Sequence, residues 1–133
     1  MKTDWPRVLI VDDDANIPRA LRRLLSLHEL RGVEAHDAAT ALALLREQDV
    51  DVLITDVRLA GTSGILLVEE ARRIDAHLPV VIMSGAPLSG RSSSAHPTGD
   101  KTLFMQKPGD RIVLVQWIRD ALARRPPRPR RPA

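Results

Sequence analysis

Acidic side chains, a hydroxyl and an amine follow short apolar runs, which is where polar groups gather in many α/β proteins. Residues 8–11 lead into three consecutive acids and residues 51–55 into a fourth, while 79–83 and 103–105 precede a serine and a lysine. The set comprises Asp12, Asp13, Asp14, Asp56, Ser84 and Lys107. If the runs are neighbouring parallel strands, these groups converge on one edge of a sheet.

The chemistry that such a set supports is phosphoryl transfer assisted by a divalent cation. Clustered carboxylates repel one another unless a cation neutralises them, and Mg²⁺ takes oxygen ligands while keeping several waters. A carboxylate held beside Mg²⁺ can attack a phosphoryl group and form an acyl phosphate. Lys107 would offset charge on the transferring oxygens, and the Ser84 hydroxyl would hydrogen-bond the new phosphoryl group.

The elements that must position these groups alternate along the chain. We expect strands at 8–11, 33–36, 51–55, 79–83 and 103–105, and helices at 17–27, 38–46, 64–74 and 111–123. Asp110 is placed to cap the last helix. Strands alternating with helices predict a parallel sheet covered by helices on both faces, with right-handed crossovers.

Two segments depart from this alternation. Residues 86–99 contain Pro87, Gly90, three serines and Pro97, so we expect a fourth helix there that is short, irregular or absent. Residues 125–133 alternate proline with arginine, which favours an extended, disordered tail. We therefore divide the chain into one domain at 7–124 and a basic tail at 125–133.

The composition fits one domain in a reducing compartment. The chain has 133 residues and no cysteine, which excludes disulfides and thiolate metal sites and agrees with a cytoplasmic location. No apolar stretch reaches the roughly 18–20 residues that span a membrane. The last ten residues carry five arginines and no acid, so the basic character belongs mainly to the tail.

The motifs resemble the response-regulator receiver family (CheY-like) of two-component signal transduction. The resemblance covers about residues 7–123 and rests on four motifs in order: Val11-Asp12-Asp13-Asp14, Asp56 with Gly64 eight residues later, Met83-Ser84-Gly85 and Lys107-Pro108. It implies a flavodoxin-like five-stranded parallel sheet with helices on both faces. Ala60 replaces a usual proline, and Gly109 replaces the aromatic residue that usually follows the Lys-Pro pair.

The resemblance also implies roles for individual residues. Asp56 would be the phosphorylation site. Asp12 and Asp13 would form the acidic pair around Mg²⁺ or Mn²⁺, with Asp13, Asp56 and the backbone carbonyl of Arg58 as direct ligands. Ser84 would be the switch hydroxyl, Phe104 its aromatic partner, and Lys107 the amine that contacts the phosphoryl group.

The partners that the resemblance implies are a sensor histidine kinase or a phosphotransfer protein, and a downstream protein target. The protein would be a signalling switch that gains and loses phosphate, not a turnover enzyme. A homodimer stays open, no membrane partner is expected, and contact with nucleic acid is expected only weakly through the basic tail.

Two other functions remain as alternatives. A pseudo-receiver would keep the fold as an interaction module without accepting phosphate. A Mg²⁺-dependent phosphatase of the haloacid-dehalogenase type would use Asp12 as nucleophile and Asp14 as acid and base, but it would leave Asp56 unexplained. Substitution of Asp56 and of Asp12 distinguishes these alternatives from a receiver.

Overall fold

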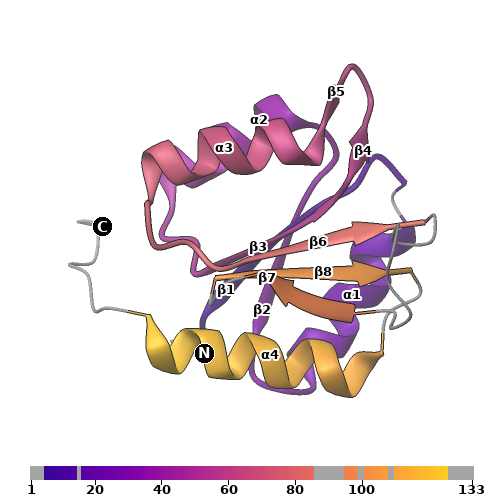
Figure 1. The fold of residues 1–133 in the computed structure, drawn as a ribbon, viewed down its shortest axis with the longest axis vertical. Coiled ribbons are helices and arrows are strands. Elements are labelled where there is room, and N and C mark those ends of the chain that lie inside the picture. The colour runs from indigo at the N-terminus through magenta and orange to yellow at the C-terminus, as the bar shows by residue number, and fades with distance from the viewer. Residues whose placement is uncertain (1–4, 15, 86–94, 99–100, 108–109, 126–133) are drawn as a thin grey trace.

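A parallel sheet forms the centre of the computed structural model, which describes residues 5–14, 16–85, 95–98, 101–107 and 110–125 (Figure 1). Five parallel strands are hydrogen-bonded in the order β2-β1-β3-β6-β8. Their bounds are β1 Arg7–Val11, β2 Arg31–Ala35, β3 Val52–Asp56, β6 Val80–Ser84 and β8 Thr102–Gln106. The predicted flavodoxin-like sheet of five parallel strands is therefore confirmed.

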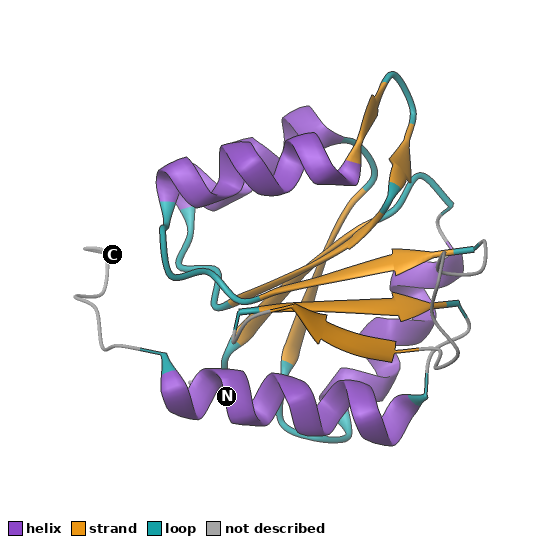
Figure 2. Ribbon diagram, in the orientation of Figure 1, coloured by secondary structure: helices purple, strands orange, loops and turns teal. Residues whose placement is uncertain are grey.

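Helices cover both faces of this sheet, with α1 and α4 on one side and α2 and α3 on the other (Figure 2). The bounds are α1 Asn16–Ser26, α2 Ala38–Glu47, α3 Gly64–Ile74 and α4 Arg111–Arg124. Three of the helices begin at a side-chain cap: Asp37 accepts from Thr40, Ser63 from Leu66, and Asp110 from two amides of α4. Such caps satisfy backbone N–H groups that the first helical turn leaves unpaired.

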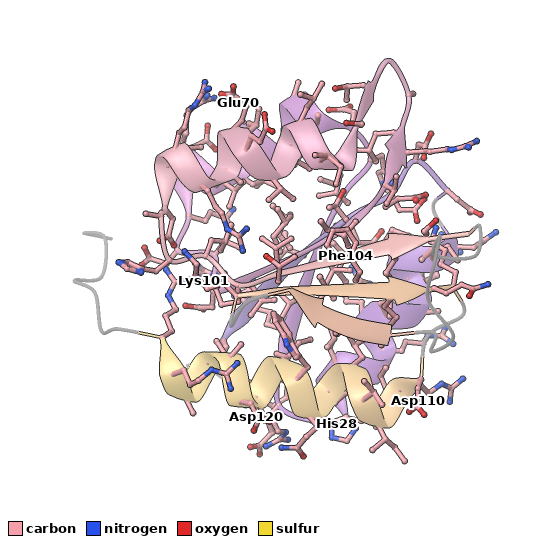
Figure 3. The ribbon with its side chains drawn as sticks, viewed as in Figure 1. His28, Glu70, Lys101, Phe104, Asp110 and Asp120 are labelled. Atoms are coloured by element: carbon pink, nitrogen blue, oxygen red, sulfur yellow. The ribbon has the colours of Figure 1, made fainter. Side chains whose placement is uncertain are left out.

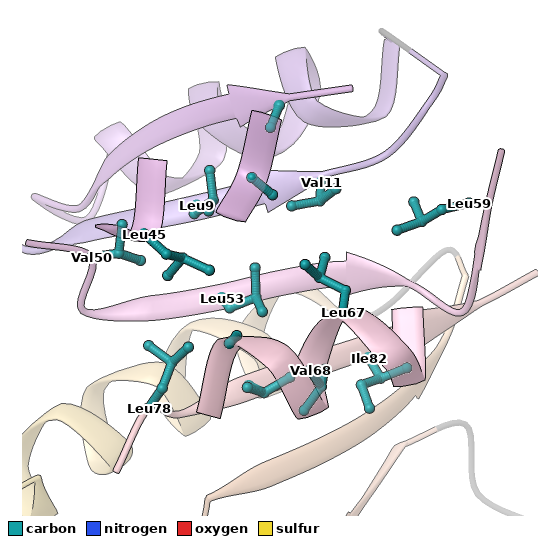
Figure 4. Close-up of a cluster of buried hydrophobic side chains, with 14 residues drawn as sticks. Leu9, Val11, Leu45, Val50, Leu53, Leu59, Leu67, Val68, Leu78 and Ile82 are labelled. Carbon is teal, nitrogen blue, oxygen red and sulfur yellow. The ribbon is translucent and has the colours of Figure 1, made fainter. Parts of the chain in front are cut away.

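Alternating side chains of the strands fill two separate core clusters. On β1, Leu9 and Val11 face the α2 and α3 side, whereas Val8 and Ile10 face the α1 and α4 side. Figure 4 shows the first cluster, in which Leu53 of β3 lies among leucines and valines of the flanking elements. Because successive residues of a strand point to opposite faces, continuous apolar runs are what a sheet covered on both sides requires.

A sixth strand, β7 Ala95–Thr98, extends the sheet at the β8 edge and runs antiparallel to β8 (Figure 1). The sequence analysis expected a short, irregular or absent helix between β6 and β8 and did not anticipate a strand there. A short edge strand satisfies backbone hydrogen bonds in a segment too poor in helix formers for a helix, and proline is tolerated at an edge. Residues 86–94 and 99–100 lie outside the described residues.

A small antiparallel hairpin follows β3 and was also not anticipated. It consists of β4 Arg58–Leu59 and β5 Thr62–Ser63 and leads directly into α3. Gly61 turns the hairpin with a φ of 77°, a conformation that residues with a side chain rarely adopt. The hairpin lies beside the edge of the sheet at which the parallel strands end (Figure 1).

Side chains of two arginines tie together the edge at which the parallel strands begin. Arg72 of α3 donates to the carbonyls of Leu78 and Lys101, with N–O distances of 2.9–3.2 Å. Arg125, which the sequence analysis placed in the tail, forms an ion pair with Asp75 and donates to the carbonyl of Asp51 at 3.1 Å. Its side chain is largely buried, so the folded part of the chain extends at least to residue 125.

The rest of the predicted tail, residues 126–133, lies outside the described residues. Among the residues that the structure describes, no helix has the length and apolar character needed to cross a membrane.

Candidate functional site

Side chains from three strands meet at the edge where the parallel strands end. Asp12 follows β1, Asp56 ends β3, and Lys107 follows β8. The Lys107 ammonium group donates to Asp12 Oδ2 at 2.7 Å and to Asp56 Oδ2 at 3.1 Å. These three residues were predicted to converge from their positions behind apolar runs, and the structure brings them into direct contact.

The carboxylates also lie close enough together to hold a metal ion. One oxygen from each of Asp12, Asp13 and Asp56 can be chosen so that all three atoms lie within 4.8 Å of one another. Asp12 is buried, Asp56 is half-buried and Asp13 is exposed, so the group opens to solvent on one side. A donor set made only of carboxylate oxygens and open to water suits a hard divalent cation such as Mg²⁺ or Mn²⁺.

The Lys107 amine stays protonated in this environment. Partial burial by itself lowers the pKa of Lys107, but the hydrogen bonds from its ammonium to Asp12 and Asp56 outweigh burial and raise the pKa above its ordinary value. Three carboxylates and one ammonium leave the cluster with a net charge of −2 when all are ionised. The cluster therefore attracts a divalent cation even with Lys107 in place.

The backbone around Asp56 is held closely by its neighbours. The buried Thr55 hydroxyl donates to the Asp56 carbonyl at 2.9 Å, and the Arg58 N–H donates to Asp56 Oδ1 at 3.3 Å. A Cβ atom added to Gly64 would lie 2.0 Å from the Asp56 carbonyl oxygen, so only glycine allows α3 to begin here. The carboxylate thus projects from a backbone that is fixed on both sides.

The loop after β1 is arranged around Asp12. The Asp14 N–H donates to Asp12 Oδ1 at 2.9 Å, and the His36 ring nitrogen Nδ1 lies 3.2 Å from the Asp12 carbonyl oxygen. Asp14 itself is exposed, and its Oδ1 accepts from the N–H of Asn16 at the start of α1. Its carboxylate therefore organises the loop and is not one of the three that group together, which weakens the assignment of Asp14 as an acid and base.

The predicted switch residues lie on one face of the sheet. Ser84 is the last residue of β6, and its carbonyl accepts from the Lys107 N–H at 2.7 Å. Ser84 lies two residues after Ile82 on β6, so the two side chains point to the same face of the sheet. Ile82 pairs in register with Phe104 of β8. Phe104 is half-buried and packs against the first core cluster (Figure 3). Both side chains therefore start from the α2 and α3 side of the sheet.

Several supporting residues were missed by the sequence analysis. Thr55 and His36 were given no role there, although each contacts the backbone of an aspartate of the site. No local motif identifies such contacts, because they depend on which strands become neighbours. The predicted role of Arg58, whose backbone carbonyl would be a metal ligand, is compatible with the hydrogen bond from its N–H to the Asp56 carboxylate.

Comparisons with known proteins agree with this geometry. Residues 8–119 match a family model described as "Response regulator receiver domain". The chain is 30% identical over 120 residues to the transcriptional regulatory protein GlrR of Escherichia coli, covering 90% of this chain and 27% of that protein. It spans about half of the length of the mycobacterial transcriptional regulatory protein PrrA.

Solved structures give the same result. The receiver domain from the hybrid histidine kinase CckA superposes with a TM-score of 0.70 at 30% identity, covering 87% of this chain and 98% of that one. A CheY-like response regulator receiver domain protein from Methanospirillum hungatei superposes with a TM-score of 0.74 at 19% identity, covering 90% and 95%. At that lower identity the second comparison concerns the fold alone.

Proposed function

The chain belongs to the response regulator receiver domain family, and we propose that it is a phosphoacceptor switch whose phosphorylation site is Asp56. Members of this family are signalling switches of two-component systems and not classical enzymes. The observation that carries the proposal is the Lys107 ammonium, which contacts the Asp12 and Asp56 carboxylates at the sheet edge. An amine placed there can balance the charge of a phosphoryl group attached to Asp56.

In the proposed reaction, an Asp56 carboxylate oxygen attacks the phosphorus of a phosphohistidine on a histidine kinase or a phosphotransfer protein. A bond between phosphorus and Asp56 forms while the bond between phosphorus and the donor nitrogen breaks. Asp56 suits this role because its side chain is partly exposed, whereas that of Asp12 is almost fully buried. The Lys107 ammonium stabilises negative charge on the carboxylate before the transfer and on the phosphoryl oxygens after it.

Asp12, Asp13, Asp56 and the carbonyl of Arg58 are the groups that would hold a divalent cation here. When bound, Mg²⁺ or Mn²⁺ supplies positive charge that stabilises the phosphoryl oxygens during transfer. The three carboxylate oxygens within 4.8 Å support this assignment.

The proposal extends to how the signal leaves the site. The Ser84 hydroxyl would hydrogen-bond the phosphoryl group, and Phe104 would respond because both start from the same face of the sheet. The readout would be altered contact with a downstream protein, either in the cytoplasm as a single domain or within a longer regulator. A homodimer and weak binding of nucleic acid by residues 125–133 remain secondary proposals.

The test is the intact mass of the protein after treatment with a small-molecule phosphodonor and Mg²⁺. The wild-type chain should gain one phosphoryl group, and Asp56→Asn should gain none. Asp14→Asn is the matched control, because it removes a neighbouring carboxylate outside the metal group, and it should still be labelled. Unchanged labelling of Asp56→Asn would reject the proposed site.

Turnover of a phosphate ester, measured beside this labelling, separates the alternatives. A haloacid-dehalogenase-type phosphatase would lose turnover of a phosphate ester on Asp12→Asn and keep it on Asp56→Asn. A pseudo-receiver would not be labelled as the wild-type chain or as any variant, although the wild-type chain and the variants would fold and have the same melting temperature.

A further inference from the structure

A groove of about 690 Å³ opens on the side of the molecule covered by α1 and α4. Helix α1 lines it with Ile17, Leu21, Leu24 and Leu27, and the other side is formed by the start of α4. Lys107 and Gly85 lie at one end, so the groove reaches the edge of the sheet that carries the candidate site. A hollow of this size lies within the range of pockets that bind small molecules.

Residues of the second core cluster, on the α1 and α4 side of the sheet, form the floor of the groove. Leu114 and Met83 belong to that cluster and are buried, and Leu21 and Leu24 pack against it while remaining partly accessible. Leu27 stands at the rim with 80% of its surface exposed. The described residues thus leave a continuous apolar surface open to solvent at a place where two helices flank it.

The charged residues that line the groove in the described part of the chain are cationic. Besides Lys107, which is paired with two aspartates, these are Arg23 of α1 and Arg111 of α4. Neither arginine forms an ion pair with any described residue, whereas the adjacent Arg22 pairs with Glu34 at 3.1 Å. Among the residues that the structure describes, no acidic side chain lines the groove.

We propose that this groove binds a small amphiphilic anion, with its apolar body against Leu21, Leu24 and Leu114 and its negative head between Arg23 and Arg111. The apolar floor provides the hydrophobic contribution, and the guanidinium groups of Arg23 and Arg111, which form no ion pair within the described part of the chain, select the negative charge. A carboxylate on an aliphatic or aromatic body is the simplest ligand that meets both requirements. This binding does not require phosphorylation of Asp56.

A regulatory consequence rests on the proposed function. Lys107 lines the groove and contacts Asp56, so a bound anion would change the environment of the amine that serves phosphorylation. If the bound anion changes the equilibrium of Asp56 phosphorylation by a given factor, thermodynamic linkage requires that phosphorylation change the affinity for the anion by the same factor.

The test measures binding of decanoate by calorimetry, and also by the fluorescence of Trp117, which packs against the second core cluster. Decyltrimethylammonium, which has the same chain length and the opposite charge, is the control ligand. We expect one decanoate per chain and at least about tenfold weaker binding of the cation, the order expected from losing charge-assisted hydrogen bonds. Equal affinity for both ligands would overturn the proposal.

Variants locate the binding site. Ala20→Phe adds a side chain at an exposed position that lines the groove, so it should abolish binding while the melting temperature stays unchanged. Arg23→Gln and Arg111→Gln should each weaken decanoate binding about tenfold. Arg19→Gln, an exposed arginine of α1 that does not line the groove, is the matched control and should bind as the wild type does.

Other occupants give different results. If a second copy of the chain fills the groove, the protein without ligand will sediment as a dimer that Ala20→Phe dissociates. If only a helix of a partner protein fits, decanoate will not bind at all. Either result would overturn the assignment to a small anion, and a failure to phosphorylate Asp56 would leave it unaffected.

Discussion

Lys107 carries the only amine that contacts the acidic cluster among the described residues. It bonds to the Asp12 and Asp56 carboxylates, which come from strands that are neighbours in the sheet but 44 residues apart in the chain. Without it, like charges of Asp12, Asp13 and Asp56 would face one another with less compensation. Removal of Lys107 would leave all three carboxylates in place but take away the positive charge beside Asp56. It should therefore affect phosphorylation more than assembly of the metal ligands.

Lys107→Ala should reduce the rate of Asp56 phosphorylation by about a hundredfold, the order of magnitude for losing one group that stabilises transition-state charge. Divalent-cation binding should persist, because the carboxylates remain. The control is Lys101→Ala, since Lys101 lies at the opposite edge of the sheet and donates to the carbonyl of Ala76 (Figure 3). Equal rates for the two variants would contradict the role assigned to Lys107.

Gly85 follows Ser84, the proposed switch residue, and leaves space beside the candidate site. Beyond its chain neighbours, an added Cβ atom would meet no atom of a described residue within 4 Å, so we expect a larger residue to fit without strain. Gly85→Val should slow hydrolysis of phosphorylated Asp56 several-fold by shielding the phosphoryl group from water. The phosphoprotein half-life measures this, and Gly85→Ala should be intermediate. A half-life that does not lengthen would show that access at this position does not limit hydrolysis.

At the scale of elements, the parallel strands and their helices were predictable because each has a strong local signal. Runs such as 8–11 are continuous and apolar, and in a parallel sheet the residues that follow such runs lie at one edge. This is why the sequence alone could predict that Asp12, Asp56 and Lys107 lie close together. The helix bounds differ from the predicted ones by one residue or none.

The remaining elements lack such signals. Strand β7 is four residues long and exists because β8 offers an unpaired edge, which is a property of the assembled sheet. The hairpin of β4 and β5 has two residues in each strand, too few for any periodicity. Close contacts such as the one between Gly64 and the Asp56 carbonyl likewise depend on how β3 and α3 meet.

Gly64→Ala tests the junction of β3 and α3. The added Cβ would overlap the Asp56 carbonyl oxygen, so backbone shifts must follow and should cost about 1–3 kcal/mol of unfolding free energy. Phosphorylation should slow as well, because Asp56 would move. Gly85→Ala adds the same methyl group in open space and should leave stability almost unchanged. Chemical denaturation of both variants makes the comparison, and equal stabilities would refute the predicted overlap.

At the scale of the whole molecule, the edge at which the parallel strands end differs from the edge at which they begin. One edge holds the charged cluster, and the other is tied together by Arg72 and Arg125. Arg125 joins the end of α4 to the start of β3 and to the turn after α3. The folded domain therefore includes a residue that composition alone assigns to the basic tail.

Truncation should reveal this boundary. Removal of residues 126–133 should leave the melting temperature nearly unchanged, whereas removal of 125–133 should cost about 1–3 kcal/mol by removing the ion pair between Arg125 and the largely buried Asp75. Arg125→Gln in the full chain should match the longer truncation. If both truncations melt alike, Arg125 contributes nothing to stability.

The bond between Lys107 and Asp12 joins residues 95 positions apart in the chain. During synthesis the acids are made early and the amine late, so a growing chain that has not reached β8 carries the aspartates without their counter-charge. Both core clusters are also incomplete until β8, because Phe104 packs against one and Leu103 and Met105 belong to the other. The site can therefore assemble only after most of the domain has left the ribosome, and unfinished chains cannot form the complete candidate site.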